Sequence, residues 1–240
     1  MNEPQVNPPE VREPQVSEPR IIEVRRKVLK ENDALARSLR DRFRDAGVQV
    51  ISLVSSPGAG KTALLERLLT DLRPLHEVAA LVGDLATEND ATRLARSGAP
   101  VKQITTGTIC HLDASMVERA LNGWNLRELD FLFIENVGNL VCPSSFDLGE
   151  DLRVVLVSTT EGEDKPLKYP TIFNSADVAI ITKMDLAEAV EADVPLLIQN
   201  ILGVRPGMRV FHVSSRSGQG MKELENFLIS RLEEVPAQAG

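Results

Sequence analysis

A glycine-rich stretch between a strand-like run and a helix-like run constrains the fold of this chain more than any other feature. Residues 48–54 (VQVISLV) are apolar and β-branched, as in a buried strand, and residues 61–72 (KTALLERLLTDL) have leucines at helical spacing. The stretch between them, SSPGAG, contains two glycines, which permit the tight turn that a direct strand-to-helix connection needs. The sequence therefore predicts a strand, a loop and a helix in direct succession.

The rest of the chain repeats this alternation. Helices are predicted near 88–96, from Asp113, near 187–202 and over 220–233, and strands over 77–83, 101–105, 130–135, 152–158, 176–182 and 208–214. Strands that are apolar at nearly every position and separated by helices are typical of a parallel sheet covered on both faces. The predicted fold class is therefore α/β, with a doubly wound, mostly parallel sheet whose ligands bind at the carboxyl ends of the strands.

The N-terminal region differs in composition from the rest. Residues 1–20 are rich in proline and poor in large side chains, so they cannot bury enough apolar surface to offset the entropy of ordering, and we predict a disordered tail. Residues 21–46 have helical spacing, with apolar residues close to one face: Ile21, Val24, Val28, Leu35, Leu39 and Phe43. The predicted division is a tail over 1–20, an N-terminal helix over 21–46 and one domain over 47–236.

Charge and the distribution of apolar residues exclude some classes of protein. A formal net charge of −8 and a pI near 5.1 argue against a nucleic-acid-binding protein, which would usually have a basic face. No apolar run approaches the roughly 20 residues that span a bilayer, so we expect no membrane association. The acidic, proline-rich start of the chain is unlike a signal peptide. We therefore expect a cytoplasmic protein whose two cysteines are thiols or ligands rather than a disulfide.

Residues 55–62 have the composition of a P-loop, so the domain is predicted to be a P-loop NTPase. The glycines let backbone N–H groups surround a phosphate, and the N-terminus of the next helix adds a positive dipole end. Lys61 is predicted to reach the β- and γ-phosphates, and the Thr62 hydroxyl to bind Mg²⁺. Ser55 replaces the first glycine of the usual G-x-x-x-x-G-K-[ST] pattern and must adopt a conformation that a Cβ atom permits. The predicted nucleotide contacts in this region are Gly58, Ala59, Gly60, Lys61, Thr62 and Ala63.

The segment ITKMDL (181–186) indicates which nucleotide binds. Lys183 and Asp185 fit the N/T-K-x-D pattern, in which the carboxylate accepts hydrogen bonds from the guanine N1–H and its exocyclic amine. Adenine lacks this pair of donors and would leave the carboxylate unpaired, so we predict guanine. Ser214 and Ser215, which follow the last predicted strand, are expected to close over the base. The alternative interpretation of Asp185 is an exposed residue that starts a helix.

Two carboxylates end neighbouring strands and should point toward the phosphates. They are Asp84 in LVGDLATEND and Glu135 in FIENVG. One is expected to orient Mg²⁺ and the other the attacking water, because phosphoryl transfer needs positioning and charge more than covalent chemistry. The predicted catalytic residues are thus Lys61, Asp84 and Glu135, with Thr62 and one of the two carboxylates as Mg²⁺ ligands. The alternative is that either carboxylate merely caps a turn.

Cys110, His111 and Cys142 form a candidate metal site. Cys110 and His111 leave one strand end and Cys142 follows another, so all three can converge on one edge of the sheet. Both adjacent residues can ligate only where the chain bends, and the turn before Asp113 offers such a bend. Two thiolates and an imidazole suit Zn²⁺ or Ni²⁺ rather than Mg²⁺ or Ca²⁺, and a second subunit in a C₂ dimer could complete the coordination. The alternative is that the cysteines only fill space in the core.

Five segments together resemble the HypB family, which comprises nickel-incorporation accessory GTPases of [NiFe]-hydrogenase maturation within the SIMIBI-type P-loop GTPases. They are SSPGAGKT, GDLATENDATR, TTGTICHLDASMV, IENVGNLVCP and DKPLKYP…ADVAIITKMDL, and the similarity runs from about Ile22 to the C-terminus. Some members carry an N-terminal cysteine cluster or a His-rich tract. Residues 1–20 have neither, so we expect neither nickel storage nor a separate high-affinity site here.

The resemblance implies a GTP-dependent homodimer that binds nickel or zinc at its interface. It would act with nickel-delivery accessory proteins and the hydrogenase large subunit, with GTP, Mg²⁺ and Ni²⁺ or Zn²⁺ as cofactors. Carried over residue by residue, the metal ligands are Cys110, His111 and Cys142. The phosphate and Mg²⁺ contacts are Gly58, Gly60, Lys61, Thr62 and Asp84, and the guanine contact is Asp185. No arginine finger is recognisable, so we expect slow GTP hydrolysis.

Two other functions remain open from the sequence. A urease- or cobalamin-enzyme-type maturation GTPase would keep the nucleotide chemistry and change the client protein. A regulatory or redox module would instead use Cys110 and Cys142 as a reversible disulfide. The Cys-His and Val-Cys-Pro segments favour hydrogenase maturation over the first alternative, and free thiols under mild oxidation would exclude the second.

Overall fold

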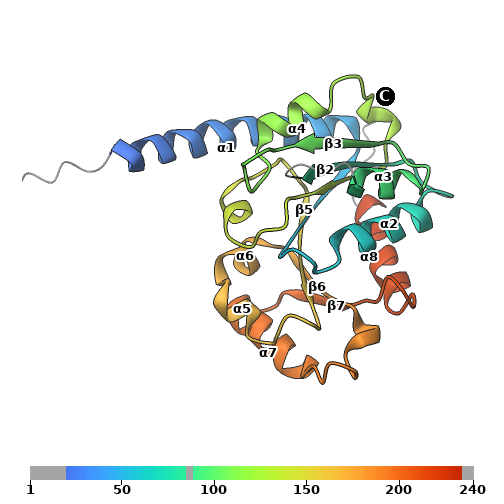
Figure 1. The fold of residues 1–240 in the computed structure, drawn as a ribbon. Helices are drawn as coiled ribbons and strands as arrows, with labels where there is room; N and C mark the ends of the chain where they lie inside the picture. The colour runs from blue at the N-terminus through green and yellow to red at the C-terminus, as the bar shows by residue number, and fades with distance from the viewer. Residues whose placement is uncertain (1–19, 85–88, 234–240) are drawn as a thin grey trace, which may run out of the picture.

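The computed structural model describes residues 20–84 and 89–233, which form a seven-stranded sheet with helices on both sides (Figure 1). The strand order is β3-β2-β4-β1-β5-β6-β7, and every neighbouring pair is parallel. The strands are β1 (Gln49–Ser55), β2 (Val78–Asp84), β3 (Val101–Thr105), β4 (Phe131–Glu135), β5 (Leu152–Ser158), β6 (Val178–Thr182) and β7 (Arg209–His212). The predicted parallel α/β fold is confirmed.

The helices alternate with these strands along the chain. They are α1 (Arg20–Ala46), α2 (Lys61–Leu72), α3 (Asn89–Ala95), α4 (Ala114–Ala120), α5 (Lys165–Lys168), α6 (Pro170–Ser175), α7 (Val194–Val204) and α8 (Met221–Glu233). Short 3₁₀ turns η1 (Leu126–Glu128), η2 (Cys142–Ser145) and η3 (Met184–Leu186) lie in the connections. Within the described residues, no helix combines the length and apolar character needed to cross a membrane.

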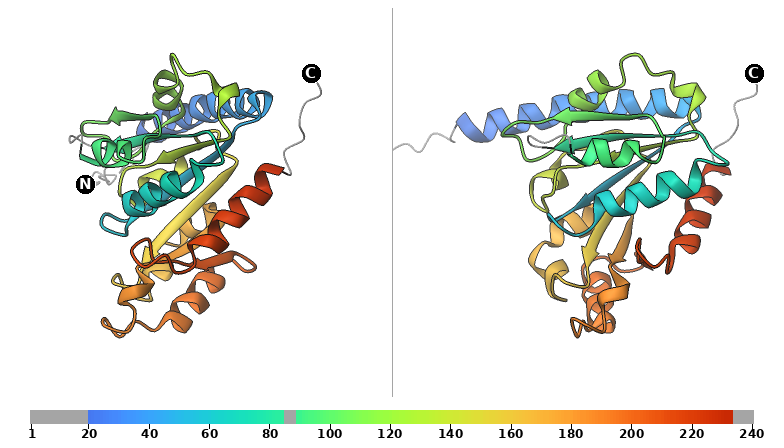
Figure 2. Two further views of the ribbon diagram at one scale, coloured as in Figure 1. Left: turned by 90° about the vertical axis from the view of Figure 1, so that its right-hand side faces the viewer. Right: turned by 45° about the vertical axis from the view of Figure 1, so that its right-hand side comes forward.

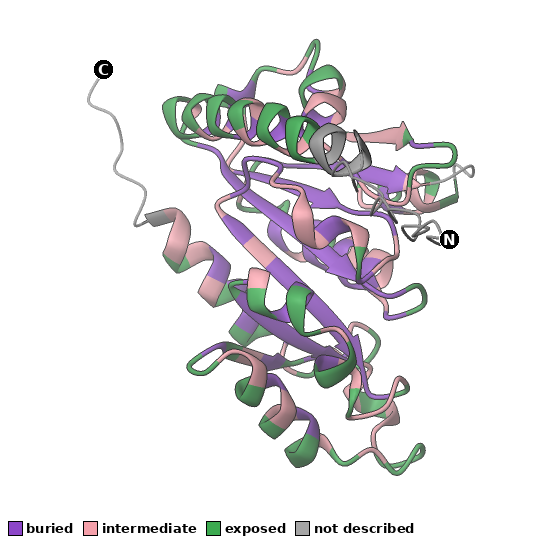
Figure 3. Ribbon diagram, turned by 90° about the vertical axis from the view of Figure 1, so that its left-hand side faces the viewer, coloured by how far each residue is buried: buried purple, intermediate pink, exposed green. Residues whose placement is uncertain are grey.

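The two faces of the sheet are buried under different helices because successive strand residues point to opposite sides. On one face Ile51, Phe131 and Phe133 pack with leucines of α2 and α8. The other face carries two clusters, one formed with α1 and α4 and one with α6 and α7 (Figure 2). Figure 3 shows the strands buried along most of their length. The sheet is therefore doubly wound, which leaves the carboxyl ends of the strands free for ligands.

Helix α1 is only partly covered by the domain. Leu39 and Phe43, near its C-terminal end, are buried against the sheet, whereas Val28 is 47% exposed. The N-terminal half of α1 extends beyond the rest of the domain (Figure 1). The predicted apolar face therefore packs only in its C-terminal part. The side chains of Ile21 and Val24, and nearly all of the predicted tail over 1–20, lie outside the described residues.

One predicted helix begins later than expected. Residues 187–191 form turns, and α7 starts at Val194. Glu191 has a φ of 52°, which a continuous helix cannot accommodate, and Asp193 caps α7 by accepting a hydrogen bond from the Leu196 backbone N–H at 2.9 Å. The cap predicted at Asp113 is present, because its side chain accepts from the Met116 N–H at 2.8 Å.

Candidate nucleotide site and metal centre

The P-loop lies between β1 and α2, at the carboxyl edge of the sheet. Gly58 and Gly60 have positive φ values of 76° and 96°, so the turn uses the conformational freedom of both glycines. A cleft of about 480 Å³ opens at this point and is lined by P-loop residues together with Asp84 and Glu135. The structure thus brings the predicted phosphate contacts and both predicted carboxylates to one cleft.

Lys61 is held inside this cleft. Its side chain is 7% exposed, and its Nζ donates a hydrogen bond to the Ser55 hydroxyl at 2.9 Å. Burial lowers the pKa of Lys61, and the nearby charge of Glu135 opposes that shift. Ser55 ends β1 in an extended conformation, which satisfies the requirement that a Cβ atom imposes at the first P-loop position. The serine that replaces glycine therefore also provides a partner for the P-loop lysine.

Glu135 is buried at the end of β4, with only 3% of its surface exposed. One carboxylate oxygen, Oε1, accepts a hydrogen bond from the Thr62 hydroxyl at 2.7 Å, while Oε2 is buried and has no hydrogen-bond partner among the described residues. Burial raises the pKa of Glu135 to about 7, against the opposing effects of the Thr62 hydrogen bond and of Lys61. A buried, unpartnered carboxylate oxygen beside a threonine hydroxyl suits the oxygen-ligand chemistry around Mg²⁺.

This raised pKa predicts a pH-dependent effect of replacing Glu135 with glutamine. The unfolded chain loses the carboxyl proton near the ordinary value of 4.5, whereas the folded chain keeps it until about pH 7, so wild-type stability falls as pH rises through that window. Glutamine keeps an acceptor for Thr62 but carries no charge. We expect it to stabilise the nucleotide-free protein above pH 7 by on the order of 3 kcal/mol and to change little below pH 4.5.

Urea unfolding of both proteins across this pH range measures the effect. Glu118→Gln, on the exposed surface of α4, is the matched control and should not alter the pH dependence. If the free energy of unfolding of wild type and Glu135→Gln depended on pH in the same way, the raised pKa of Glu135 would be contradicted.

Two charged residues of the cleft, and a glutamate that binds the P-loop, were missed by the sequence analysis. Asp90 and Arg93, on one face of α3, line the same cleft, and the Arg93 Nε lies 2.7 Å from the Glu66 carboxylate. Glu161 accepts hydrogen bonds from the P-loop Ser56 hydroxyl and from the Ser158 backbone N–H, and it also pairs with Lys165. The i, i+3 spacing of Asp90 and Arg93 just after a strand end was the available signal for the first two. Glu161 left no comparable pattern.

The predicted base-binding residues lie at the ends of β6 and β7. Asp185 is exposed, and its Oδ1 accepts a hydrogen bond from the buried Ser214 hydroxyl at 2.6 Å. Lys183 has a φ of 57°, and its carbonyl accepts from the Thr159 hydroxyl at 2.9 Å. The Thr182 hydroxyl donates to the Ala59 carbonyl at 2.6 Å, which ties this strand end to the P-loop. Ser215 is half-buried next to Ser214.

Cys110, His111 and Cys142 converge at the same edge of the sheet, where each can offer a ligand atom within 4.8 Å of the others. The Cys110 and Cys142 sulfur atoms lie 2.7 Å apart, and no disulfide joins them. The His111 ring stacks on Phe146 at a centroid distance of 3.9 Å, and its Nδ1 is buried without a partner among the described residues. Burial lowers the pKa of His111, which favours the neutral imidazole that ligates metals.

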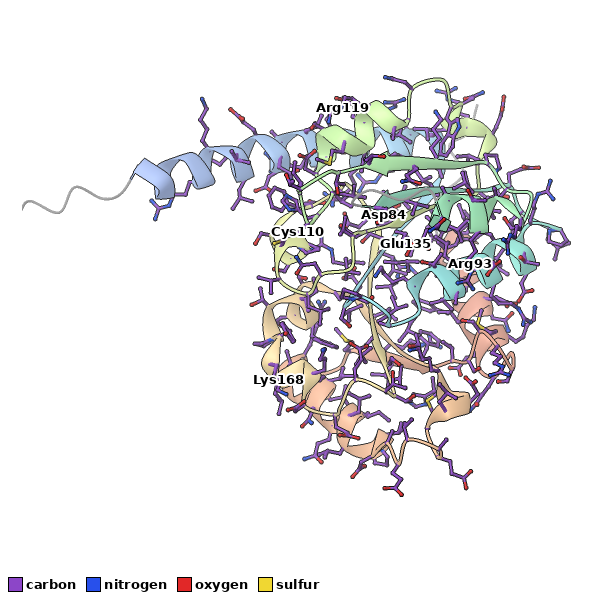
Figure 4. All side chains as sticks on the ribbon, in the orientation of Figure 1. Asp84, Arg93, Cys110, Arg119, Glu135 and Lys168 are labelled. Atoms are coloured by element: carbon purple, nitrogen blue, oxygen red, sulfur yellow. The ribbon has the colours of Figure 1, made fainter. Side chains whose placement is uncertain are left out.

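The chemistry of this donor set fits a thiophilic metal. Two sulfur atoms and an unpartnered imidazole nitrogen match the ligands of Zn²⁺ or Ni²⁺, and three ligands leave a coordination position open. In the view of Figure 4, Asp84 and Glu135 lie between Cys110 and Arg93. The candidate metal centre and the phosphate cleft therefore occupy one edge of one domain.

Comparison with known proteins gives consistent matches. The family model described as "CobW/HypB/UreG, nucleotide-binding domain" matches residues 49–212. The chain is 47% identical over 200 residues to the hydrogenase maturation factor HypB of Rhizobium leguminosarum bv. viciae, covering 83% of this chain and 67% of that protein. It is 42% identical over 212 residues to the hydrogenase/urease maturation factor HypB of Helicobacter pylori, covering 87% of each.

A solved structure shares the fold over nearly its whole length. The crystal structure of HypB from Helicobacter pylori in complex with nickel matches with a TM-score of 0.80 and 40% sequence identity, covering 88% of this chain and 99% of that one. The similarity thus includes both the nucleotide-binding core and the segments that carry the cysteines.

Proposed function

Because the chain belongs to the CobW/HypB/UreG family, we propose that it couples GTP hydrolysis to the handling of nickel for [NiFe]-hydrogenase maturation. The chain is a P-loop GTPase of the HypB type. One observation carries the proposal: Cys110, His111 and Cys142 converge beside the turn that follows Glu135, at the nucleotide-binding edge of the sheet. The metal is the cargo of this reaction, and the nucleotide determines how firmly the protein holds it.

In the nucleotide site, each residue has a role that follows from its position. The P-loop N–H groups and the Lys61 ammonium bind the β- and γ-phosphates, and Thr62 and Asp84 would hold Mg²⁺. The bound ion would neutralise charge on the phosphate oxygens. Asp185 accepts from the guanine N1–H and amine, with Ser214 fixing the carboxylate.

Hydrolysis requires a water molecule in line with the bond between the γ-phosphorus and its bridging oxygen. The unpartnered Oε2 of Glu135 orients this water and accepts its proton, since its pKa near 7 suits a base at neutral pH. The water oxygen bonds to phosphorus, the bridging P–O bond breaks, and GDP and phosphate leave. Turnover is slow because charge on the leaving oxygen is neutralised without an arginine supplied by a second protein.

In the metal site, three ligands from one chain leave the coordination incomplete. Ile109 and Val141, which precede the two cysteines, are large apolar residues with 40% and 62% of their surface exposed. A second copy of the chain would cover these side chains and supply further ligands under two-fold symmetry. We propose that GTP promotes this dimer, which then acts with nickel-delivery accessory proteins and the hydrogenase large subunit. The name of the Helicobacter pylori relative makes urease the second candidate client.

A nickel titration of the reduced protein tests the proposal. We expect a near-UV thiolate-to-nickel absorption band both with and without a non-hydrolysable GTP analogue. The apparent nickel Kd obtained from this band should differ between the protein with the analogue and the protein without it. Cys110→Ala should reduce the band, because only the Cys142 thiolate remains, and weaken nickel binding about a hundredfold or more, because loss of even an outer-shell partner costs 10–100-fold. His212→Ala, an exposed histidine on β7, is the control and should bind as wild type does. A band of unchanged intensity and unchanged nickel affinity in Cys110→Ala, or a nickel Kd that does not change with nucleotide, would contradict the proposal.

A further inference from the structure

Three asparagine side chains hold the segment that carries Cys110 and His111, and they bind alternate residues of it. The Asn139 amide donates to the Cys110 carbonyl at 3.4 Å. The Asn136 Oδ1 accepts from the Leu112 N–H at 3.0 Å, and the Asn32 Oδ1 accepts from the Ala114 N–H at 2.9 Å. The main chain of the first two predicted metal ligands is thus positioned by side chains rather than by regular secondary structure.

Two of these asparagines, Asn139 and Asn32, also bind residues 141–147, the segment that carries Cys142. Asn139 Oδ1 accepts from the Val141 N–H at 2.8 Å and from the Cys142 N–H at 3.4 Å. Asn32, 8% exposed on α1, donates through its amide to the Asp147 carbonyl at 2.9 Å. The Cys110–His111 segment and the Cys142 segment are therefore joined at two places. Asn32 of α1 joins them at one place, and Asn139, in the turn before Cys142, joins them at the other.

Asn136 differs from the other two because it directly follows Glu135 in the phosphate cleft. It is 2% exposed, its backbone N–H donates to the Leu53 carbonyl of β1 at 3.0 Å, and its Oδ1 also accepts from its neighbour Val137 at 2.9 Å. Two residues later, Gly138 lies so close to the P-loop that an added Cβ atom would be 3.0 Å from the Pro57 Cα. A shift of this turn when the γ-phosphate enters or leaves must therefore move Asn136 relative to Leu112.

We propose that Asn136 is the positioning residue that passes the nucleotide state from the phosphate cleft to the Cys110–His111 segment, with Asn32 as the fixed anchor on α1. The proposal rests on the coupling between nucleotide and metal set out under the proposed function, and it assigns that coupling to one hydrogen bond. Asn136 and Asn32 each accept one N–H of the same segment, two residues apart, but only Asn136 belongs to the turn that borders the phosphates. The two asparagines therefore form a matched pair for experiment.

The experiment measures the nickel Kd in the GDP-bound and GTP-analogue-bound forms and takes their ratio. Asn136→Ala is expected to bring this ratio to within about twofold of one, because the metal segment no longer follows the turn. Asn136→Asp keeps an acceptor for the Leu112 N–H and should retain the wild-type ratio. Asn32→Ala should weaken nickel binding about tenfold in both states, leave the ratio unchanged and leave basal GTP hydrolysis unaltered. Thermal melting and nucleotide binding verify that each variant is folded.

Gly138→Ala tests the same coupling by moving the turn that carries Asn136 while Asn136 itself is unchanged. This test remains available if Asn136→Ala does not fold. The added methyl group would push the turn away from Pro57 while all three asparagines remain, so the ratio should fall as well. The inference is overturned if Asn136→Ala keeps the wild-type ratio of nickel Kd values, or if Gly138→Ala keeps it where Asn136→Ala does not fold. It is also overturned if Asn32→Ala brings the ratio as close to one as Asn136→Ala does. A wild-type ratio of one overturns the proposed coupling together with this inference, whereas a wild-type ratio that survives in the variants overturns the inference alone.

Discussion

Replacing Asp185 with asparagine is expected to lower the affinity for GTP at least about a thousandfold and to create affinity for xanthosine triphosphate. The carboxylate of Asp185 can accept two hydrogen bonds from guanine, whereas an asparagine amide presents donors toward the donors of the base. Xanthine carries a carbonyl in place of the exocyclic amine and so restores the match. A site built to pair a polar group of its substrate rejects an unmatched analogue by about 10⁴–10⁵ in other enzymes, which sets the scale.

The structure gives this prediction a specific geometry. The Ser214 hydroxyl donates to the Asp185 Oδ1 at 2.6 Å, so the carboxylate is oriented before the base arrives. An asparagine can keep that bond only by directing its amide oxygen at Ser214, which turns its NH₂ toward the base. The affinities of fluorescent GTP and XTP analogues for wild type and Asp185→Asn measure this change of preference from guanine to xanthine. Asp193→Asn, at the N-cap of α7, is the control, since asparagine also caps helices. Unchanged GTP affinity in Asp185→Asn would place the base elsewhere.

The sheet was predictable from sequence because buried parallel strands leave continuous apolar runs. β3 and β5 have the predicted bounds, and the other strands differ by a few residues at their ends. The helix predicted near 187–202 was wrong at its start, since apolar spacing does not reveal that Glu191 adopts a left-handed conformation. Pattern identifies an element more reliably than the residue at which it begins.

The candidate site was only partly predictable from the sequence, and there is a physical reason why some of its residues could be identified and others could not. The residues that we propose to bind phosphate, base and metal have distinctive chemistry at strand ends, so sequence position and residue type point to them together. Asn32 and Asn136 act on backbone groups 82 and 24 residues away in the chain. Any residue other than proline can supply a backbone N–H, so these partners have no sequence signature. Only the three-dimensional structure places the asparagines beside the segment that carries Cys110 and His111.

Replacing Lys61 with alanine is expected to reduce GTP hydrolysis by about a thousandfold or more. Positive groups aimed at the transferred phosphate contribute factors of this size in phosphoryl-transfer enzymes. Lys61 is buried in a cleft that also contains Asp84, Asp90 and Glu135, so its loss leaves the phosphates facing carboxylates. The pKa of Glu135 should rise further as well, because the Lys61 charge now holds it down. Turnover measured by phosphate release at saturating GTP, over a range of pH, gives both effects.

Ser55→Ala distinguishes a catalytic role of Lys61 from a structural one. In the structure the Lys61 Nζ donates to the Ser55 hydroxyl, and to bind GTP it has to turn to the phosphate oxygens instead. If Lys61 acts on the phosphates, Ser55→Ala removes only a partner that Lys61 has before GTP binds and should change turnover less than about tenfold, because that hydrogen bond is not made in the transition state. If Lys61 served only to fill and brace the loop, the two variants would lose activity to a similar extent. A Lys61→Ala protein that melts as wild type does yet fails to hydrolyse GTP, beside an active Ser55→Ala, locates the effect in the charge that Lys61 brings to the phosphates.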